Sequence, residues 1–137
     1  MGRIVAFDYG RRRVGVAATD PLQIIANAVD TIETKEIFNF LKKYMATEQV
    51  ETFVVGFPYN DGFKPNAVIP YIEKFIAALK KTYPHIPVQK ADESFTSRMA
   101  MQTLVMSGVS KKERHKKENL DKISATIILQ AYLEDRQ

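Results

Sequence analysis

The sequence predicts an α/β protein built around one mixed sheet, and three observations support this fold class. Two apolar runs, at residues 3–8 and 13–18, are separated by a short turn that contains Gly10, which is typical of an antiparallel hairpin. Further along the chain, apolar runs alternate with segments of helical periodicity. With 137 residues, the chain is long enough to bury a hydrophobic core, so we expect a single domain over residues 1–137.

Three further segments carry the pattern of strands. Residues 27–32 follow the hairpin as a third strand. Residues 52–57 form a continuous apolar run that Pro58 ends, as in a central strand covered on both faces. Residues 86–91 form a weaker strand, in which Pro87 favours a strand start or a sheet edge. We therefore expect antiparallel strands one to three, followed by two parallel strands, with helices flanking the sheet.

Four segments show helical spacing. Thr34 is a candidate N-cap for the first helix, whose apolar positions are Ile37, Phe40, Leu41 and Tyr44. The second helix has Pro70 near its start and an apolar stripe of Val68, Ile69, Ile72, Phe75, Ile76 and Leu79. The third is expected from residue 96 or 97 to Gly108, and a polar segment follows at residues 110–119. The stripe expected for the last helix consists of Leu120, Ile123, Ile127, Ile128 and Ala131.

The composition is that of a globular protein and excludes several classes. The chain has no cysteine, so neither a disulfide nor a thiolate metal site can form. No stretch has the pattern of a signal peptide or the length of an apolar membrane span. We therefore expect a cytoplasmic protein that makes no contact with a membrane.

The basic residues are clustered, and the formal net charge is +4. The two clusters consist of Arg11, Arg12 and Arg13, and of Lys111, Lys112, Arg114, Lys116 and Lys117. Either cluster alone is equally well explained as a solvated run of charge. Because both flank candidate site carboxylates, together they favour a phosphate-rich partner.

Carboxylates occur at three positions suited to a metal site. Asp8 closes the first strand, Asp92 and Glu93 close the last one, and Asp121 shares a face of the last helix with apolar side chains. Each has an ordinary alternative, because Asp92 and Glu93 could cap a helix and Asp121 could interact with a helix dipole. Together they offer oxygen ligands, which Mg²⁺ and Mn²⁺ prefer, and they could hold one metal ion or two. The two histidines are less suited to catalysis, since His85 lies in a turn and His115 in a basic run.

Gly10, Gly15 and Gly56 lie near predicted strand ends. Without a Cβ, such positions allow a phosphate or a metal to approach the backbone closely. Tight turns and close packing between sheet and helix are the alternative explanation, and for Gly15 they account for the glycine nearly as well.

Four blocks resemble the YqgF/RuvX family, the Holliday junction resolvase-like proteins or pre-16S rRNA nucleases. The first is Asp8-Tyr9-Gly10 with Arg13-Val14-Gly15-Val16-Ala17, and the second is Val54-Val55-Gly56-Phe57-Pro58 with Asp61-Gly62. The third is Asp92-Glu93 with Thr96-Ser97-Arg98 and Ala100, and the fourth is Asp121-Lys122 with Ala125, Ile128-Leu129 and Tyr132-Leu133. The blocks follow the order of the family along essentially the whole chain.

The resemblance implies an RNase H-like fold and a divalent-metal nuclease that matures the 5′ end of small-subunit ribosomal RNA. It maps the catalytic, metal-binding carboxylates onto Asp8, Glu93 and Asp121. The family usually has arginine after its Asp-Glu pair, where this chain has Ser94. If that arginine contacts phosphate, either Arg98 or the basic segment must substitute for it, or activity is reduced. The implied substrate is an rRNA precursor or branched DNA, bound by a monomer or a homodimer.

Two other functions fit part of the pattern. Asp8-Tyr9-Gly10 followed by Gly15 also resembles the first phosphate loop of the actin, hexokinase and Hsp70 superfamily, but the chain is too short for the two halves of that fold. A non-catalytic nucleic-acid-binding assembly factor would use the basic clusters equally well. Such a binder has no need of carboxylates beside its arginines, because they repel phosphate.

Overall fold

The computed structural model describes residues 2–58, 67–92 and 117–136, with the side chains of the last segment described from Ile123 onward. A five-stranded sheet of order β3-β2-β1-β4-β5 forms its centre. The strands are β1 (Arg3–Tyr9), β2 (Arg13–Thr19), β3 (Ala26–Glu33), β4 (Val50–Phe57) and β5 (Val88–Asp92). The helical elements are η1 (Thr34–Glu36), α1 (Ile37–Thr47), α2 (Ile69–Thr82) and α5 (Lys117–Asp135).

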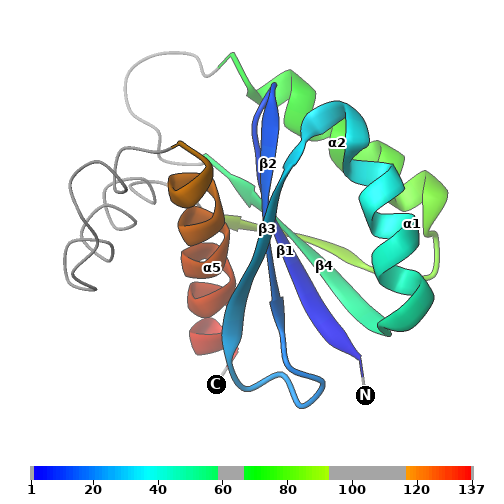
Figure 1. Cartoon of the computed structure of the whole chain (residues 1–137), viewed down its shortest axis with the longest axis vertical. Coiled ribbons are helices and arrows are strands. Elements are labelled where there is room, and N and C mark those ends of the chain that lie inside the picture. The colour runs from blue at the N-terminus through cyan, green and yellow to red at the C-terminus, as the bar shows by residue number, and fades with distance from the viewer. Residues whose placement is uncertain (1, 59–66, 93–116, 137) are drawn as a thin grey trace.

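The pairing of the strands confirms the predicted mixed α/β sheet. β1 pairs antiparallel with β2, and β2 pairs antiparallel with β3. β1 pairs parallel with β4, and β4 pairs parallel with β5. Helices α1 and α2 lie on one face of the sheet and α5 lies on the other (Figure 1).

Strand alternation divides the core into two layers of different side-chain size. Phe7 of β1 points to α1 and α2, where its ring centroid lies 5.6 Å from that of Phe53 and 5.2 Å from that of Phe75. The α5 layer is built largely from small residues of the sheet, including Ala6 and Ala17. Small side chains allow a helix to approach a sheet closely, so α5 packs tightly against β1 and β2.

The stripe predicted for the last helix was wrong by part of a turn. The residues buried against the sheet are Ser124, Ala125, Ile128, Leu129 and Leu133. Ile123, Ile127 and Ala131 are only half-buried. This helix is apolar around much of its circumference, so apolar positions alone do not identify its buried face. Close packing against the sheet selects the face with Ser124 and Ala125, because their side chains are small.

Two other local predictions need correction. Thr34 does not cap a helix with its side chain; its hydroxyl donates to the carbonyl of Gly10 at 2.7 Å, and η1 precedes α1. Residues 117–119, expected in the polar segment, already belong to α5. Pro87 precedes the edge strand β5, as its sequence position indicated. The helix predicted between 96 and 108 lies outside the described residues.

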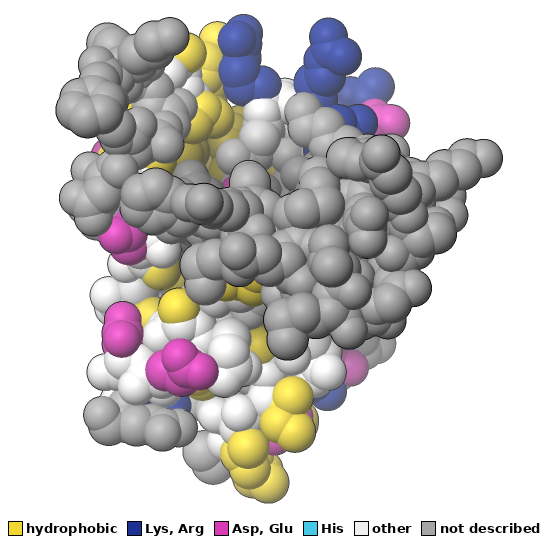
Figure 2. Space-filling view, turned by 90° about the vertical axis from the view of Figure 1, so that its left-hand side faces the viewer, with side chains coloured by type: hydrophobic (Ala, Val, Ile, Leu, Met, Phe, Trp, Pro, Cys, Tyr) yellow, Lys and Arg dark blue, Asp and Glu magenta, His cyan; other side chains and the backbone are white. Residues whose placement is uncertain are grey.

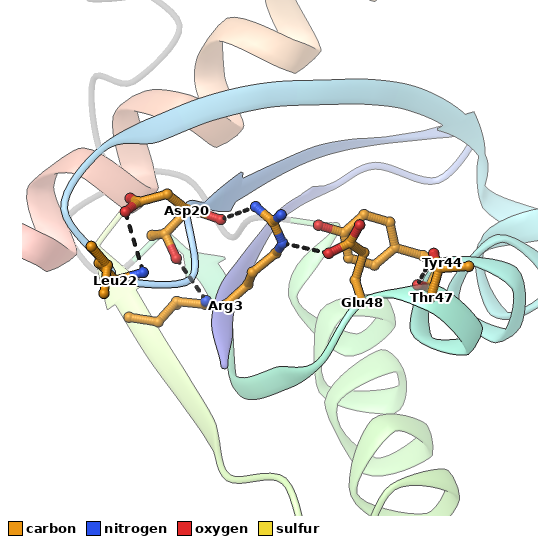
Figure 3. Close-up of polar contacts among 8 residues, drawn as sticks. Arg3, Asp20, Leu22, Tyr44, Thr47 and Glu48 are labelled. Carbon is orange, nitrogen blue, oxygen red and sulfur yellow. Dashed lines mark hydrogen bonds and ion pairs between the residues drawn. The ribbon is translucent and has the colours of Figure 1, made fainter. Parts of the chain in front are cut away.

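At the end of the sheet where β1 begins, Arg3 connects several segments of the chain (Figure 3). Its Nε lies 2.8 Å from Oε2 of Glu48, and its Nη1 donates to the carbonyl of Thr19 at 2.9 Å. The hydroxyl of the buried Thr19 accepts from the backbone N–H of Ile4 at 2.9 Å. Both chain termini lie at this end of the molecule (Figure 1). In the described ranges, no helix combines the length and the apolar character needed to cross a bilayer.

Candidate nuclease site and nucleic-acid interface

The strand that carries Asp8 ends, and the helix that carries position 121 begins, at the end of the sheet opposite the termini. Strands β1, β4 and β5 are parallel, so their carboxyl ends share one edge. Asp8 is the last residue but one of β1, and position 93 directly follows the last residue of β5. Figure 1 shows the beginning of α5, which carries position 121, at this same end.

Asp8 lies on the α5 face of the sheet. Its neighbours on that face of β1, Ile4 and Ala6, pack in the α5 layer, whereas Tyr9 stacks on Phe75 of α2 at a centroid distance of 4.9 Å. Strand alternation therefore directs the half-buried Asp8 toward α5. Position 121 is one helical turn before Ala125, which is fully buried against the sheet, so the two positions belong to the same layer.

Glycines flank Asp8 within the sheet. Gly15 of β2 is its cross-strand partner, and extending the register of β1 and β4 by one residue places Gly56 on its other side. Gly56 in turn pairs with Ala91 of β5. In the sheet, therefore, the two positions that flank Asp8 carry no Cβ.

Asp92 lies on the other face of the sheet. Alternation along β5 places it on the side of Lys90, whose ammonium lies 4.4 Å from the ring centroid of Phe57 and 2.9 Å from Oε1 of Glu73 on α2. Asp8 and Asp92 thus belong to opposite faces, although both terminate parallel strands.

The arginine cluster forms the turn between β1 and β2. Arg11 and Arg12 are exposed, and the guanidinium carbon of Arg11 lies 4.6 Å from the ring centroid of Tyr71. Figure 2 shows Lys and Arg side chains gathered at this end of the molecule. Burial raises the pKa of Tyr9, so its phenol remains protonated at neutral pH and does not serve as a base.

Gly10 has a structural role in this turn. A Cβ at position 10 would lie 2.6 Å from the carbonyl oxygen of Arg13, a distance that side chains do not tolerate. The tight turn alone therefore requires glycine at this position.

The remaining predicted residues lie at or beyond the limits of the description. Those outside it are Glu93, Arg98, Lys111, Lys112, Arg114 and Lys116. Lys117 and Asp121 have a described backbone in α5 but no described side chain. Among the side chains that are described, no three His, Asp or Glu residues converge in a way that could hold a metal.

The structure adds residues to the basic turn that the sequence did not assign to it. Thr31, Glu33, Thr34 and Lys35 line a groove together with the three arginines. A single lysine after a strand matches no motif, and only the strand pairing brings it beside the turn.

The family of the chain follows from its sequence relatives. Residues 2–135 match the family described as "RuvX: Holliday junction resolvase". The chain belongs to the RuvX family. A relative from Bacteroides thetaiotaomicron, named "Putative pre-16S rRNA nuclease", is 46% identical over 100% of this chain and 99% of its own length. One of the same name from Parabacteroides distasonis is 47% identical over 100% of this chain and 98% of its own length.

A solved structure shows the fold of this RuvX-family chain to be RNase H-like. The structure is titled "T. thermophilus RuvC in complex with Holliday junction substrate", and it matches with a TM-score of 0.60 at 13% identity. The match covers 99% of this chain and 96% of the RuvC chain. The expected fold class and family are thereby confirmed.

Proposed function

We propose that the chain is a divalent-metal-dependent nuclease that hydrolyses phosphodiester bonds of structured RNA, at the 5′ end of pre-16S rRNA. The observation that carries this is the place of Asp8 at the carboxyl edge of the parallel strands, on the α5 face and between two glycines. The name of the full-length relatives supports the substrate. Such a substrate would place the protein in the cytoplasm.

The catalytic carboxylates in this proposal are Asp8, Glu93 and Asp121. The donor set fits a hard cation, because all three residues offer oxygen and the chain contains no cysteine. When bound, one or two Mg²⁺ or Mn²⁺ ions at such a site supply an activated water and stabilise the leaving oxygen. Asp8 contributes a carboxylate on a rigid strand, and Gly15 and Gly56 leave room beside it for a phosphate.

We propose Glu93, and not Asp92, as the ligand from the end of β5. Asp92 belongs to the face covered by α2, opposite to Asp8. If the alternation of β5 continued by one residue, position 93 would fall on the face of Ala91, which packs in the α5 layer. Separate Asp92→Ala and Glu93→Ala variants test this choice, and greater loss of cleavage in Asp92→Ala would reverse it.

The nucleic acid in this proposal is held by two groups of basic residues. One is the turn of Arg11, Arg12 and Arg13, which adjoins β1 directly after Asp8. The other consists of Arg98, Lys111, Lys112, Arg114, Lys116 and Lys117. Each phosphate contact contributes affinity independent of sequence, so these residues position the substrate and do not read bases.

A Holliday junction resolvase is the second candidate function. It is favoured by the description of the matching family and by the RuvC structure, which contains a junction substrate. A resolvase that makes symmetric cuts needs a two-fold dimer, whereas a processing nuclease can act as a monomer.

A cleavage assay separates these functions. The full chain is incubated with Mg²⁺ or Mn²⁺ and either a pre-16S rRNA fragment or a synthetic four-way DNA junction. We expect metal-dependent cleavage of the RNA, lost in Asp8→Asn by more than about 100-fold, because even residues behind metal ligands contribute 10- to 100-fold. Glu134→Gln, which changes an exposed carboxylate near the far end of α5, is the matched control. Cleavage of the junction alone would establish the resolvase, and binding of either substrate without cleavage would leave an assembly factor.

A further inference from the structure

The basic turn forms one wall of a groove at the β3 side of the candidate site. The groove has a volume of about 550 Å³ and is lined by Arg11, Arg12, Arg13, Thr31, Glu33, Thr34 and Lys35. Four of these side chains are cationic and one is anionic. Cations gathered in one concave surface repel one another and attract an anion from solution, so the lining favours an anionic occupant.

Two hydrogen bonds fix the shape of this groove. The backbone N–H of Thr34 donates to the carbonyl of Arg12 at 2.8 Å, and the hydroxyl of Thr34 donates to the carbonyl of Gly10 at 2.7 Å. They join the turn after β1 to the start of η1, two segments that are distant in sequence. The backbone that carries the cationic side chains is therefore held in place before any ligand binds, which reduces the entropy cost of ordering this segment on binding.

The strand register relates the groove to Asp8. Thr31 of β3 is the partner of Gly15, and Gly15 is the partner of Asp8. Two steps between neighbouring strands of about 4.8 Å each place Thr31 roughly 10 Å from Asp8. A single phosphate cannot occupy both places, whereas a polymer of phosphodiesters can.

We propose that this groove binds the phosphate backbone of the nucleic-acid strand on one side of the bond that is cleaved at Asp8. The inference rests on the proposed nuclease function and adds to it a substrate subsite in which Lys35 acts together with the arginine turn, beside Thr31 and Thr34. The backbone of the strand enters the groove beside Arg12 and Arg13, and the scissile phosphate lies over Gly15 and Asp8.

Glu33 allows the proposal to predict the direction in which a substitution changes the binding affinity. Its Oε2 lies 3.5 Å from the Nζ of Lys35, and the two side chains are 66% and 78% exposed. In the free protein, Glu33 offsets part of the charge of Lys35, and a phosphate in the groove must compete with it. Removing this carboxylate therefore strengthens binding, and removing a cation weakens it.

The experiment measures binding without cleavage. The full chain is titrated in EDTA with a fluorescently labelled single-stranded RNA of the pre-16S 5′ region at several salt concentrations. We expect Arg12→Ser/Lys35→Ser to reduce the slope of log affinity against log salt by about 1.4, since each single-strand phosphate contact contributes about 0.7. Glu33→Gln is expected to bind severalfold more tightly than the unmodified chain.

The matched control is Lys80→Ser/Lys81→Ser, which removes two exposed lysines at the far end of α2. An equal loss of slope in this control would show that only net charge matters, and would overturn the groove. Weaker binding of Glu33→Gln would also overturn it. Melting temperatures verify that each variant is folded.

The two proposals fail in different ways. If the unmodified chain cleaves the RNA but the groove variants bind it normally, the groove is wrong and the nuclease stands. If the groove variants lose binding but no metal supports cleavage, the groove stands and the nuclease is wrong.

Discussion

Gly15 lies directly opposite Asp8 in the ladder between β1 and β2. The register of β1 and β4 places Gly56 on the other side of Asp8, so the carboxylate is bordered by backbone in both directions across the sheet. A strand interior normally disfavours glycine, because glycine loses more conformational entropy and packs no side chain. Glycine at both positions keeps Cβ atoms out of the space beside Asp8 within the sheet, and we attribute this to function.

The first prediction concerns this space. Gly15→Val adds an isopropyl group beside Asp8 on the α5 face, so we expect weaker Mn²⁺ binding and slower cleavage. Mn²⁺ binding is followed as the rise in melting temperature with metal concentration. Ala28→Val, at an exposed position of β3, is the control for a β-branched residue in a strand. A normal response to Mn²⁺ in folded Gly15→Val would contradict the role given to Gly15, and Gly15→Ala serves if the larger side chain prevents folding.

The second prediction concerns metal and stability. A ligand that binds only the folded state raises the melting temperature by mass action, so Mn²⁺ or Mg²⁺ should stabilise the unmodified chain and EDTA should reverse this. Asp8→Asn should lose the response yet melt in EDTA at the same temperature as the unmodified chain or slightly higher, because the change removes a charge and no core volume. A full metal response in Asp8→Asn would exclude this carboxylate as a ligand.

The third prediction concerns acid stability at the β2–β3 turn. Oδ1 of Asp20 accepts from the N–H groups of Ile25 and Ile24, each at 2.8 Å, and these bonds, that of Ile25 first, lower the pKa of Asp20 below its usual 3.8. A carboxyl whose folded pKa is lowered contributes stability above its unfolded pKa and loses it as the pH falls through the folded pKa. Urea midpoints should therefore fall below about pH 4, less so in Asp20→Asn than in the Asp135→Asn control. Parallel pH curves for both variants would rule out this contribution.

The succession of strands and helices along the chain and the mixed character of the sheet were predictable from the sequence, because apolar runs and their turns carry most of that information. Asp8 was also identifiable as a candidate site residue, because a carboxylate at the end of a buried strand is costly unless a partner offsets its charge. The buried face of α5 was not, because Ser124 and Ala125 are selected by how closely the helix approaches the sheet. Nor was the groove, because Lys35 and Thr34 meet the arginine turn only through the pairing of β2 with β3. Local pattern indicates which residues are unusual, and long-range pairing determines what they adjoin.

The fourth prediction concerns Thr34. Thr34→Val keeps the size of the side chain and the charge of the groove but removes the hydroxyl that donates to Gly10, which should cost about 0.5–1.5 kcal/mol of folding free energy. RNA affinity in EDTA should also fall, because the turn that carries Arg12 loses one of its two links to η1. Thr82→Val, at the exposed end of α2, is the control. Unchanged affinity in Thr34→Val would show that the turn holds its shape without this bond.

The last prediction concerns the basic segment that leads into α5. Lys112, Lys116 and Lys117 precede Asp121 in the chain, and α5 begins at Lys117. We expect a substrate held at Asp8 to pass near the start of this helix. Replacing the three with serine should weaken RNA binding in EDTA and reduce the salt slope by about 0.7 for each lost contact, with Mn²⁺ stabilisation nearly unchanged.

The control for this triple variant is Lys43→Ser/Lys80→Ser/Lys81→Ser, which removes the same charge from exposed positions on α1 and α2. Combined with Arg12→Ser/Lys35→Ser, the reduction in slope should be additive, because the two sites contact different phosphates and share no partner. An unchanged slope in the triple variant would mean that the segment is only a solvated connector. The groove beside the arginine turn would then hold the strand alone.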